Sequence, residues 1–438
     1  MKIFKKLLIT TLLLAFYACN NESKKQSQIA NTMLMSHCIH KLTDVIVVDV
    51  FSPPVASRIY SYATLAAYET ARLSQKNTQS IASKLNDFTP MPALEKGKTY
   101  DFGVASLRAF SKTAQKLTFS SFEIEDFEAE LMPNMKENLS ETIFNNSIAL
   151  GDSVAATVLK RAAKDNYKET RGMERYAVTQ KKGDWIPTSP DYADAIEPNW
   201  MKMKTFFLEN PAQFRPQAPT PYSEIKGSAF DKLVQEVINI SKRRSPEQTT
   251  MARFWDDNAL VTKHKGHAMF ADKKMTPGGH WINIAAMMCV QKDLDLVKTT
   301  ETLALTSLAI YDSFLSCWEA KYATQRVRPQ TVIQNTVDEK WVSFLQTPPF
   351  PEYTSGHSTI SAAAAEILTA NIGDNVAYED TTEVRFGLFK RKFKSFRQAA
   401  QESSISRVYG GIHFSDATTA GSLQGQKIGK YLLKKIKK

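Results

Sequence analysis

Residues 304–329 read ALTSLAIYDSFLSCWEAKYATQRVRP, and the first half of this stretch indicates how the chain folds. Apolar side chains recur there at steps of four and three, namely at Ala304, Leu308, Tyr311, Leu315 and Trp318. This period places them on one face of an α-helix rather than on a strand. The stretch therefore predicts an amphipathic helix.

Helical periodicity or composition recurs outward from this stretch, at residues 144–162, 361–370, 393–408 and 421–436. The β-branched run at residues 45–48 could form a strand, but no partner strand is evident. We therefore predict an all-α fold, with one large helical bundle over residues 31–438. Clusters of Pro and Gly predict long loops near residues 170–225 and 270–282.

The first residues carry an export signal. Three lysines precede an apolar run at residues 7–16, which stops directly before small residues and Cys19. The run is too short to span a bilayer, which takes about 20 residues. It resembles a bacterial lipoprotein signal, which implies that Cys19 becomes the lipidated first residue; an ordinary cleaved signal with a chance cysteine is the alternative.

This interpretation divides the chain into three parts. Residues 1–18 form the signal peptide, and residues 19–30 form a polar, flexible tether. The folded domain follows. We expect an exported protein that is lipid-anchored to a bacterial cell membrane, on its periplasmic or surface face.

The charge balance and the cysteines limit the possible partners. Loss of the three signal-peptide lysines lowers the formal net charge of +11 by three, so the mature chain remains basic at +8. Such a balance favours an anionic partner, but export and the lack of a nucleic-acid-binding motif argue against nucleic acid. Cys38, Cys289 and Cys317 lie in apolar contexts without metal-ligand spacing. They are expected to be core thiols.

Two cations in the second half of the opening stretch are the first functional signal. Lys321 and Arg328 are seven residues apart. Two helical turns separate them, so a continuous helix would place both on one face, about 10 Å apart along its axis. Pro329 pushes Arg328 away from helical geometry and marks the helix end. Taken alone, the pair is better explained as solvated surface charges.

A second segment, PEYTSGHS at residues 351–358, leads into the Ala-rich helix. Thr354 or Ser355 is a natural N-cap, and the free N–H groups of a helix N-terminus favour an anion. Gly356 lets a ligand approach the backbone closely. His357 would then lie beside the anion, where it could transfer a proton. A capping serine followed by an incidental histidine is the alternative.

A third segment, SRVYGGIHFSD at residues 406–416, combines another cation with another histidine. Arg407 should close a helix and supply a planar fork for oxyanion oxygens. Two glycines should then turn the chain, and His413 should stand just before the last helix, where it could act as a nucleophile or a metal ligand. Asp416 could orient its ring.

The order Lys-x6-Arg-Pro, Ser-Gly-His and Ser-Arg-x5-His resembles a known three-part signature. It is that of the superfamily of type 2 phosphatidic acid phosphatases, bacterial class A acid phosphatases and vanadium-dependent haloperoxidases. The motifs cover residues 321–416. The segment at residues 52–60 looks like the larger exported haloperoxidase-like proteins of bacteria, so the resemblance extends over about residues 40–438.

The resemblance implies a site for vanadate, or for phosphate in its place. The oxygens would be bound by Lys321, Arg328 and Arg407, with Ser355 and the N–H of Gly356 completing the cradle. His357 would be the acid/base, and His413 would bond directly to vanadium or phosphorus. The family commonly has His-x3-Asp where this chain has His413-x2-Asp416. The partner that orients His413 is therefore left open.

Two enzyme functions share this site. A vanadate-dependent haloperoxidase would oxidise halide with hydrogen peroxide, whereas a phosphatase would hydrolyse a phosphate ester with His413 as the nucleophile. The chain length and the N-terminal segment favour the haloperoxidase. A non-catalytic binding lipoprotein is the third alternative, and the intact set of site residues argues against it.

Other polar groups are given lesser roles. His37 with His40, and His264 with His267, have helical spacing but no apparent third metal ligand. Asp256 and Asp257 are interpreted as a cap or as a supporting pair. His280 follows two glycines, so we expect it in a loop over the pocket.

Overall fold

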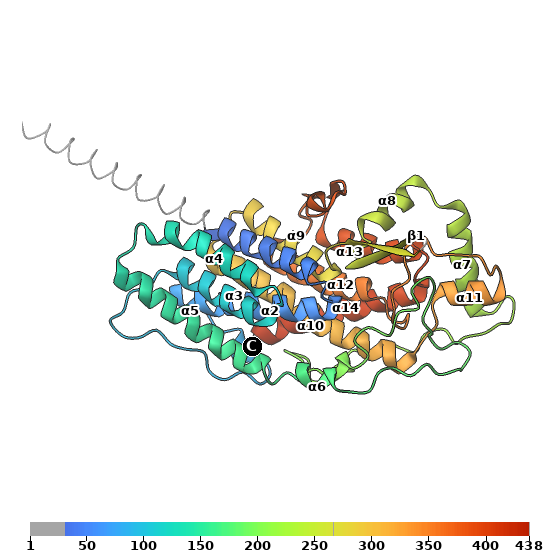
Figure 1. Cartoon of the computed structure of the whole chain (residues 1–438), viewed down its shortest axis with the longest axis horizontal. Helices are drawn as coiled ribbons and strands as arrows, with labels where there is room; N and C mark the ends of the chain where they lie inside the picture. The colour runs from blue at the N-terminus through green and yellow to red at the C-terminus, as the bar shows by residue number, and fades with distance from the viewer. Residues whose placement is uncertain (1–30, 266, 438) are drawn as a thin grey trace, which may run out of the picture.

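Helices form most of the computed structural model, which describes residues 31–265 and 267–437 (Figure 1). Residues 31–48 are helical. The later α-helices are α2 (Pro53–Ala71), α3 (Phe102–Leu117), α4 (Ser121–Lys136), α5 (Glu141–Ala162), α6 (Tyr167–Arg171), α7 (Ala229–Arg243), α8 (Pro246–Phe254), α9 (Pro277–Gln291), α10 (Leu296–Thr324), α11 (Pro329–Thr336), α12 (Gly356–Ile372), α13 (Phe396–Tyr409) and α14 (Ser415–Lys437). The predicted all-α fold is confirmed.

Short elements connect these helices. They are the 3-10 turns η1 (Arg72–Ser74), η2 (Ala82–Lys84), η3 (Trp200–Lys202) and η4 (Val384–Phe386), and the antiparallel pairs β1 (Leu260–Lys265) with β2 (Ala268–Lys273) and β3 (Tyr378–Asp380) with β4 (Arg391–Phe393). The signal peptide, the tether and Cys19 lie outside the described residues. Within the described part of the chain, no helix is both long enough and apolar enough to cross a membrane.

The 29-residue helix α10 lies in the middle of the molecule, with α12 and α14 beside it (Figure 1). Its side chains are buried on nearly every side, which is the pattern of a helix enclosed by others. Helices α3 to α5 lie at one end of the molecule, and α7, α8 and α11 lie at the other (Figure 1). The division of the chain into a single domain stays a prediction.

Helices α12 and α14 approach each other closely because small residues face the contact. A Cβ atom added at Gly425 would lie 1.9 Å from the carbonyl oxygen of Thr359, and one at Gly421 would lie 2.8 Å from that of Ser355. Ser355 N–H also donates to the carbonyl of Ala417 across the same contact. This packing fixes the N-terminus of α12 against the start of α14.

The predicted long loop near residues 170–225 is confirmed, since only η3 interrupts the chain between α6 and α7. The carboxylate of Asp312, on α10, holds this loop by accepting N–H bonds from Phe206, Phe207 and Leu208 at 2.8–2.9 Å. Backbone bonds to a buried carboxylate fix the loop firmly on the bundle.

The structure settles one open alternative and overturns one expectation about elements. Residues 45–48, for which a strand was the open alternative, belong to the helix over residues 31–48, with Val45 and Ile46 in the core and Val48 exposed. The loop expected over residues 270–282 is mostly ordered structure. Strand β2 runs to Lys273, and α9 begins at Pro277, which occupies the first helical position that proline favours.

Candidate active site

Helix α10 supplies Lys321 but not Arg328, so the expectation that one helix carries both is wrong. The helix ends at Thr324, and Gln325 adopts a left-handed conformation with φ of 49°. Arg328 is extended and is the N-cap residue of α11, which starts at Pro329. The chain turns between the two cations because Gln325 breaks the helical path.

Lys321 is fully buried and binds backbone rather than solvent. Its ammonium group donates to the carbonyl oxygens of Pro351, Glu352 and Thr354 at 3.0, 3.1 and 2.5 Å. Burial lowers the pKa of Lys321 to about 8, and the neighbouring Arg328 adds to this effect. Lys321 therefore holds residues 351–354 in place through their backbone carbonyls and contributes positive charge to the site.

The two arginines each contact one histidine. Arg328 Nη1 donates to His413 Nε2 at 3.1 Å, and Arg407 Nη1 donates to His357 Nε2 at 2.8 Å. Both guanidinium groups are fully buried. The prediction that Arg407 closes a helix is confirmed, since α13 ends two residues later, at Tyr409. The structure thus brings together cations from α10, the α11 N-cap and α13.

Several guanidinium nitrogens lack a partner. Among the described residues, Arg328 Nη2 and the Nε and Nη2 of Arg407 are buried and make no hydrogen bond. Buried donors are normally satisfied, so such a set indicates that a ligand with several acceptor oxygens fits here.

His413 stands between α13 and α14, as the sequence predicts, and it is oriented by Glu352. Its Nδ1 lies 2.8 Å from Glu352 Oε1, which also accepts the backbone N–H of Phe414 at 3.0 Å. The Nδ1 proton therefore faces the carboxylate, leaving the lone pair on Nε2. Burial, and after it the positive charge of Arg328, lowers the pKa of His413 well below its usual value. The ring is neutral and can bond through Nε2.

Asp416 does not orient His413, so that suggestion from the sequence is wrong. Its carboxylate accepts from Arg326 Nη1 at 2.7 Å and from the backbone N–H of Thr220 at 3.2 Å. Arg326 Nη1 also donates to Glu352 Oε2 at 3.2 Å. Asp416 thus supports Glu352 only indirectly, through Arg326.

Ser355 and Gly356 start helix α12 as predicted. Ser355 is the N-cap, and its side chain accepts the N–H of Ser358 at 3.3 Å. A Cβ atom at Gly356 would meet only Trp318 within 4 Å, at 3.8 Å, so space is open beside this backbone. The N–H groups of a first helical turn have no intrahelical acceptor and suit an anion.

His357 lies in the same turn, next to Arg407 and Asp257. Its Nε2 is 3.6 Å from Asp257 Oδ2. Burial, followed by the Arg407 charge, lowers the pKa of His357 to about 4. In this state the ring is neutral near pH 7, and a bound anion would favour its protonated form.

A buried series of hydrogen bonds holds Asp257 in place, and the sequence analysis did not predict this series. His280 lies in the first turn of α9, fully buried, so its expected place in a loop over the pocket is wrong. Its Nδ1 and Nε2 lie 3.0 Å from Asp257 Oδ1 and Asp380 Oδ2. Although burial lowers the pKa of His280, the two carboxylates raise it well above its usual value. The supporting role expected for the Asp256–Asp257 pair holds for Asp257, whereas Asp256 pairs with Lys274.

The other groups singled out from the sequence lie elsewhere. Cys38, Cys289 and Cys317 are buried free thiols, as predicted. His37 and His40 join no group of three potential metal ligands among the described side chains. The side chain of His264 lies outside the described part.

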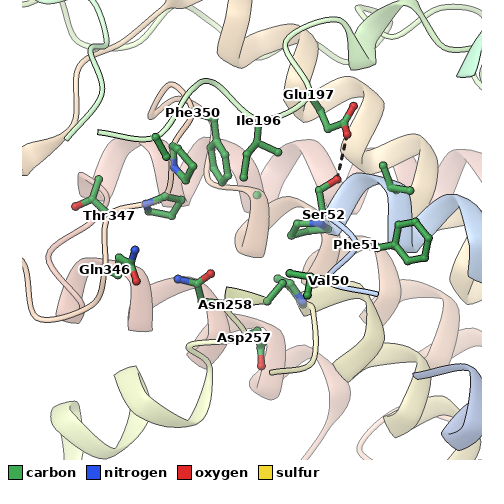
Figure 2. A pocket seen from close by; sticks show the side chains of 18 of the residues that line it. Val50, Phe51, Ser52, Ile196, Glu197, Asp257, Asn258, Gln346, Thr347 and Phe350 are labelled. Atoms are coloured by element: carbon green, nitrogen blue, oxygen red, sulfur yellow. Dashed lines mark hydrogen bonds between the residues drawn. The ribbon is translucent and has the colours of Figure 1, made fainter. Parts of the chain in front are cut away.

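A cavity of about 790 Å³ reaches the site. Gly356, His357, Arg407 and His413 form its floor, and Asp257 lies beside them. Figure 2 shows its upper wall with Phe350 and Ile196 side by side, facing Asn258 and Asp257 across the open space. The arrangement can hold a tetrahedral oxyanion between two guanidinium groups, a helix N-terminus and a neutral imidazole nitrogen, below a space large enough for a further reactant.

Comparisons with known proteins agree with this geometry. Residues 301–438 match a family model described as the VCPO second helical-bundle domain. The chain is similar to the crystal structure of a bacterial vanadium-dependent iodoperoxidase, with 39% identity, a TM-score of 0.86 and coverage of 92% of this chain and 96% of that one.

Two more distant structures share the fold. They are the holo and apo forms of a bacterial vanadium-dependent chloroperoxidase, each 15% identical to this chain. The holo form has a TM-score of 0.69 with 89% and 93% of the two chains covered, and the apo form has 0.67 with 88% and 94%. No curated protein sequence matches the chain.

Proposed function

The chain belongs to the family of bacterial vanadium-dependent haloperoxidases, and we propose that it oxidises halide with hydrogen peroxide at a vanadate bound to His413. One observation carries this proposal: Arg328, which contacts His413 Nε2, and Arg407, which lines the same cavity as His413, both carry buried guanidinium nitrogens without a partner among the described residues. When bound, vanadate supplies a Lewis-acidic centre at which peroxide is activated toward halide.

Each site residue then has a distinct proposed role. His413 Nε2 is the ligand of the central atom, and Glu352 keeps its proton on Nδ1. Arg328 and Arg407 bind the oxygens, together with the N–H of Gly356. Lys321 adds positive charge. It also holds residues 351–354, the segment that positions Ser355 as the cap of α12. These contacts satisfy the buried donors that otherwise have no partner.

His357 is the proposed acid/base of this site. Its neutral ring can accept a proton from peroxide, and the anion beside it stabilises the imidazolium that results. Asp257, held by His280, faces the same ring at 3.6 Å and adds to this stabilisation.

The proposal is tested by loading the purified protein with vanadate, removing the excess, and measuring peroxide-dependent oxidation of iodide and bromination of a phenolic dye. Hydrolysis of an aryl phosphate is measured in parallel on metal-free protein. Halide oxidation that depends on vanadate supports the proposal. Phosphate hydrolysis without halide oxidation would instead identify a phosphatase with a histidine nucleophile.

Matched variants connect the activity to the site. Arg407→Ala should abolish halide oxidation because it removes a buried anion ligand. Arg243→Ala, at an exposed position near the end of α7, should retain it. Equal activity of the two variants would place the reaction elsewhere.

We further propose that the protein is exported and anchored to a membrane through a lipid on Cys19. The support is the sequence of residues 1–28 alone, with its short apolar run, the cysteine and the polar tether. Cys19→Ser should move the protein from the membrane fraction to the soluble fraction of cells. A protein that fractionates identically with and without Cys19 would contradict the anchor.

A further inference from the structure

A buried cluster of one histidine and three carboxylates lies behind His357, and the proposed reaction uses only part of it. His280 is at its centre, with Asp257, Asp380 and Glu383 around the imidazole ring. All four side chains are at most 2% exposed. Such a cluster needs positive charge among the carboxylates, because buried like charges destabilise one another.

Asp380 holds one side of the imidazole ring. Its Oδ2 lies 3.0 Å from His280 Nε2, and its Oδ1 accepts the backbone N–H and the hydroxyl of Thr382 at 2.9 and 2.7 Å. This carboxylate therefore favours a proton on Nε2 and fixes the ring. Metal-ligating histidines commonly donate their other ring nitrogen to a carboxylate in this way. The arrangement leaves Nδ1 as the atom of His280 that can bind a metal ion.

Two carboxylates converge on Nδ1 of the same ring. Asp257 Oδ1 lies 3.0 Å from this nitrogen, and Glu383 Oε1 lies 3.6 Å from it. One ligand atom from each of the three residues lies within 4.8 Å of the other two. The ligands of a tetrahedral zinc ion lie about 2.0–2.2 Å from the metal and hence about 3.3–3.6 Å from one another. The three atoms are therefore spaced as ligands of one ion would be.

Two carboxylate oxygens of this cluster accept no hydrogen bond. Within residues 31–265 and 267–437, Asp257 Oδ2 and Glu383 Oε1 are both buried and both lack a hydrogen-bond partner. Asp257 Oδ2 faces His357 Nε2 at 3.6 Å, which is too long for a hydrogen bond. Buried acceptors are normally satisfied, so an anionic oxygen such as Glu383 Oε1 indicates that a cation belongs beside it.

Aromatic rings pack against the cluster. The ring of Trp255 stacks on His280 with centroids 4.6 Å apart and an interplanar angle of 26°, and the edge of Phe254 meets the imidazole at 5.4 Å. Trp255 is itself held by a hydrogen bond from Nε1 to Glu402 at 3.1 Å. An apolar shell of this kind limits the access of water and strengthens the attraction between a cation and its carboxylates.

We propose that His280 Nδ1, Asp257 and Glu383 bind one divalent metal ion of the zinc type, at a site distinct from the oxyanion site. An imidazole with two carboxylates suits zinc, whereas calcium and magnesium prefer oxygen ligands alone. The ligands come from the segment after α8, from the first turn of α9 and from the residue before η4. The ion therefore joins three parts of the chain and fixes Asp257, whose other oxygen faces His357.

Binding is tested by equilibrium dialysis of the chelator-treated full chain against Zn²⁺, with the bound metal measured by elemental analysis. One tightly bound zinc ion per chain is expected. Glu383→Gln keeps the shape of the side chain but removes an anionic ligand. It should weaken zinc binding by at least about tenfold, a loss that is typical even for an outer partner of a metal site. Glu379→Gln is the matched control, since Glu379 lies on the neighbouring strand β3 and pairs with Lys390 at the surface.

Crystals of the wild-type protein soaked in Zn²⁺ and measured at the zinc absorption edge locate the ion without any substitution, so they decide the question if Glu383→Gln does not fold. The strongest anomalous peak is expected within bonding distance of His280 Nδ1. The inference is overturned if the wild-type chain binds no stoichiometric zinc, if the two glutamine variants bind zinc alike, or if the peak lies elsewhere. A protonated His280 would then balance the carboxylates without a metal ion.

Discussion

His357 and His413 are both neutral, and each accepts an arginine N–H at Nε2, but they differ in where a carboxylate faces the ring. Glu352 holds the Nδ1 proton of His413, so Nε2 carries the lone pair. At His357 a carboxylate faces Nε2 itself, since Asp257 Oδ2 lies 3.6 Å from the nitrogen that accepts from Arg407. One ring is therefore suited to bond to a central atom, and the other lies where it can exchange a proton beside a bound anion.

The two histidines should separate by role when each is replaced by alanine. His413→Ala should abolish vanadate retention and turnover together, because the only direct ligand is lost. His357→Ala should retain vanadate through the two arginines but lose about 10²- to 10⁴-fold in turnover. Equilibrium dialysis with vanadate measures retention for both variants. Retention by His413→Ala and loss by His357→Ala would reverse the assignment.

Glu352→Gln should weaken vanadate binding by about 10- to 100-fold, the usual effect of removing the partner that orients a ligating histidine. The oxygen of glutamine can still accept from His413 and Phe414, but its NH2 group cannot accept the bond from Arg326. Asp416→Asn is the matched control and should change the affinity less than about threefold, since Asp416 acts only through Arg326. If Asp416→Asn has the larger effect in dialysis, Glu352 is not the orienting group.

The pKa of His357 should rise when the site binds an anion. Without one, burial and Arg407 hold it at about 4, whereas a bound phosphate or vanadate places negative charge beside the ring. The complex then takes up a proton, so binding of a given ionic form of the anion strengthens as the pH falls through the raised pKa.

Histidine ring NMR signals, assigned with single variants, measure this shift. His40 is an internal control, because burial and then Arg385 lower its pKa to about 4 as well, far from the site. Phosphate should move the midpoint of His357 toward 6.5 and leave His40 unchanged. An equal response, or none at His357, would remove it from the anion site.

Residues recognisable from local motifs were predictable, and their partners were not. Ser355, His357, Arg407 and His413 sit beside helix ends, where capping and turn residues mark them in the sequence. Glu352 lies 61 positions before His413, and only the fold brings the two together. A buried acid of this kind has no periodicity or spacing that distinguishes it from a surface acid.

At the scale of elements, the contact between α12 and α14 positions the site. Gly421 and Gly425 let α14 lie against the backbone of α12, beside Ser355 and Thr359. His413 immediately precedes α14, and His357 lies in the first turn of α12. The distance between the two histidines therefore depends on how closely these helices pack.

Gly425→Ala should destabilise the fold by about 3 kcal/mol, the upper end for overpacked sites, because its Cβ would lie 1.9 Å from a carbonyl oxygen. Gly172→Ala is the control, with φ of −95° and the nearest atom at 3.8 Å, and should stay within about 0.5 kcal/mol. Urea unfolding followed by circular dichroism measures both. A Gly425→Ala protein as stable as the control would contradict this packing.

Helices with strong periodicity were predicted correctly, including α5 and the core of α10. The errors lie where tertiary contacts or a single residue override local pattern. Residues 270–282, expected as a loop, contain the end of β2 and the start of α9. Gln325 ends α10 early without being glycine or proline, so the break falls before the helix end that Pro329 predicts.

At the scale of the whole molecule, different parts of the chain form the anion site and the cavity walls. The family model over residues 301–438 contains the three predicted motifs, whereas the cavity walls come largely from residues before position 260. The N-terminal part thus shapes access to a site that the C-terminal bundle builds. The motifs could predict the anion site, but the shape of the cavity depends on the packing of the full chain.

The central claim, that vanadate binds in the buried cation site through His413, is tested most directly by crystals of the protein soaked in vanadate and measured at the vanadium absorption edge. The strongest anomalous peak is predicted within bonding distance of His413 Nε2, between Arg328 and Arg407. A peak elsewhere in the molecule, or none at vanadate concentrations that support halide oxidation, would contradict the claim.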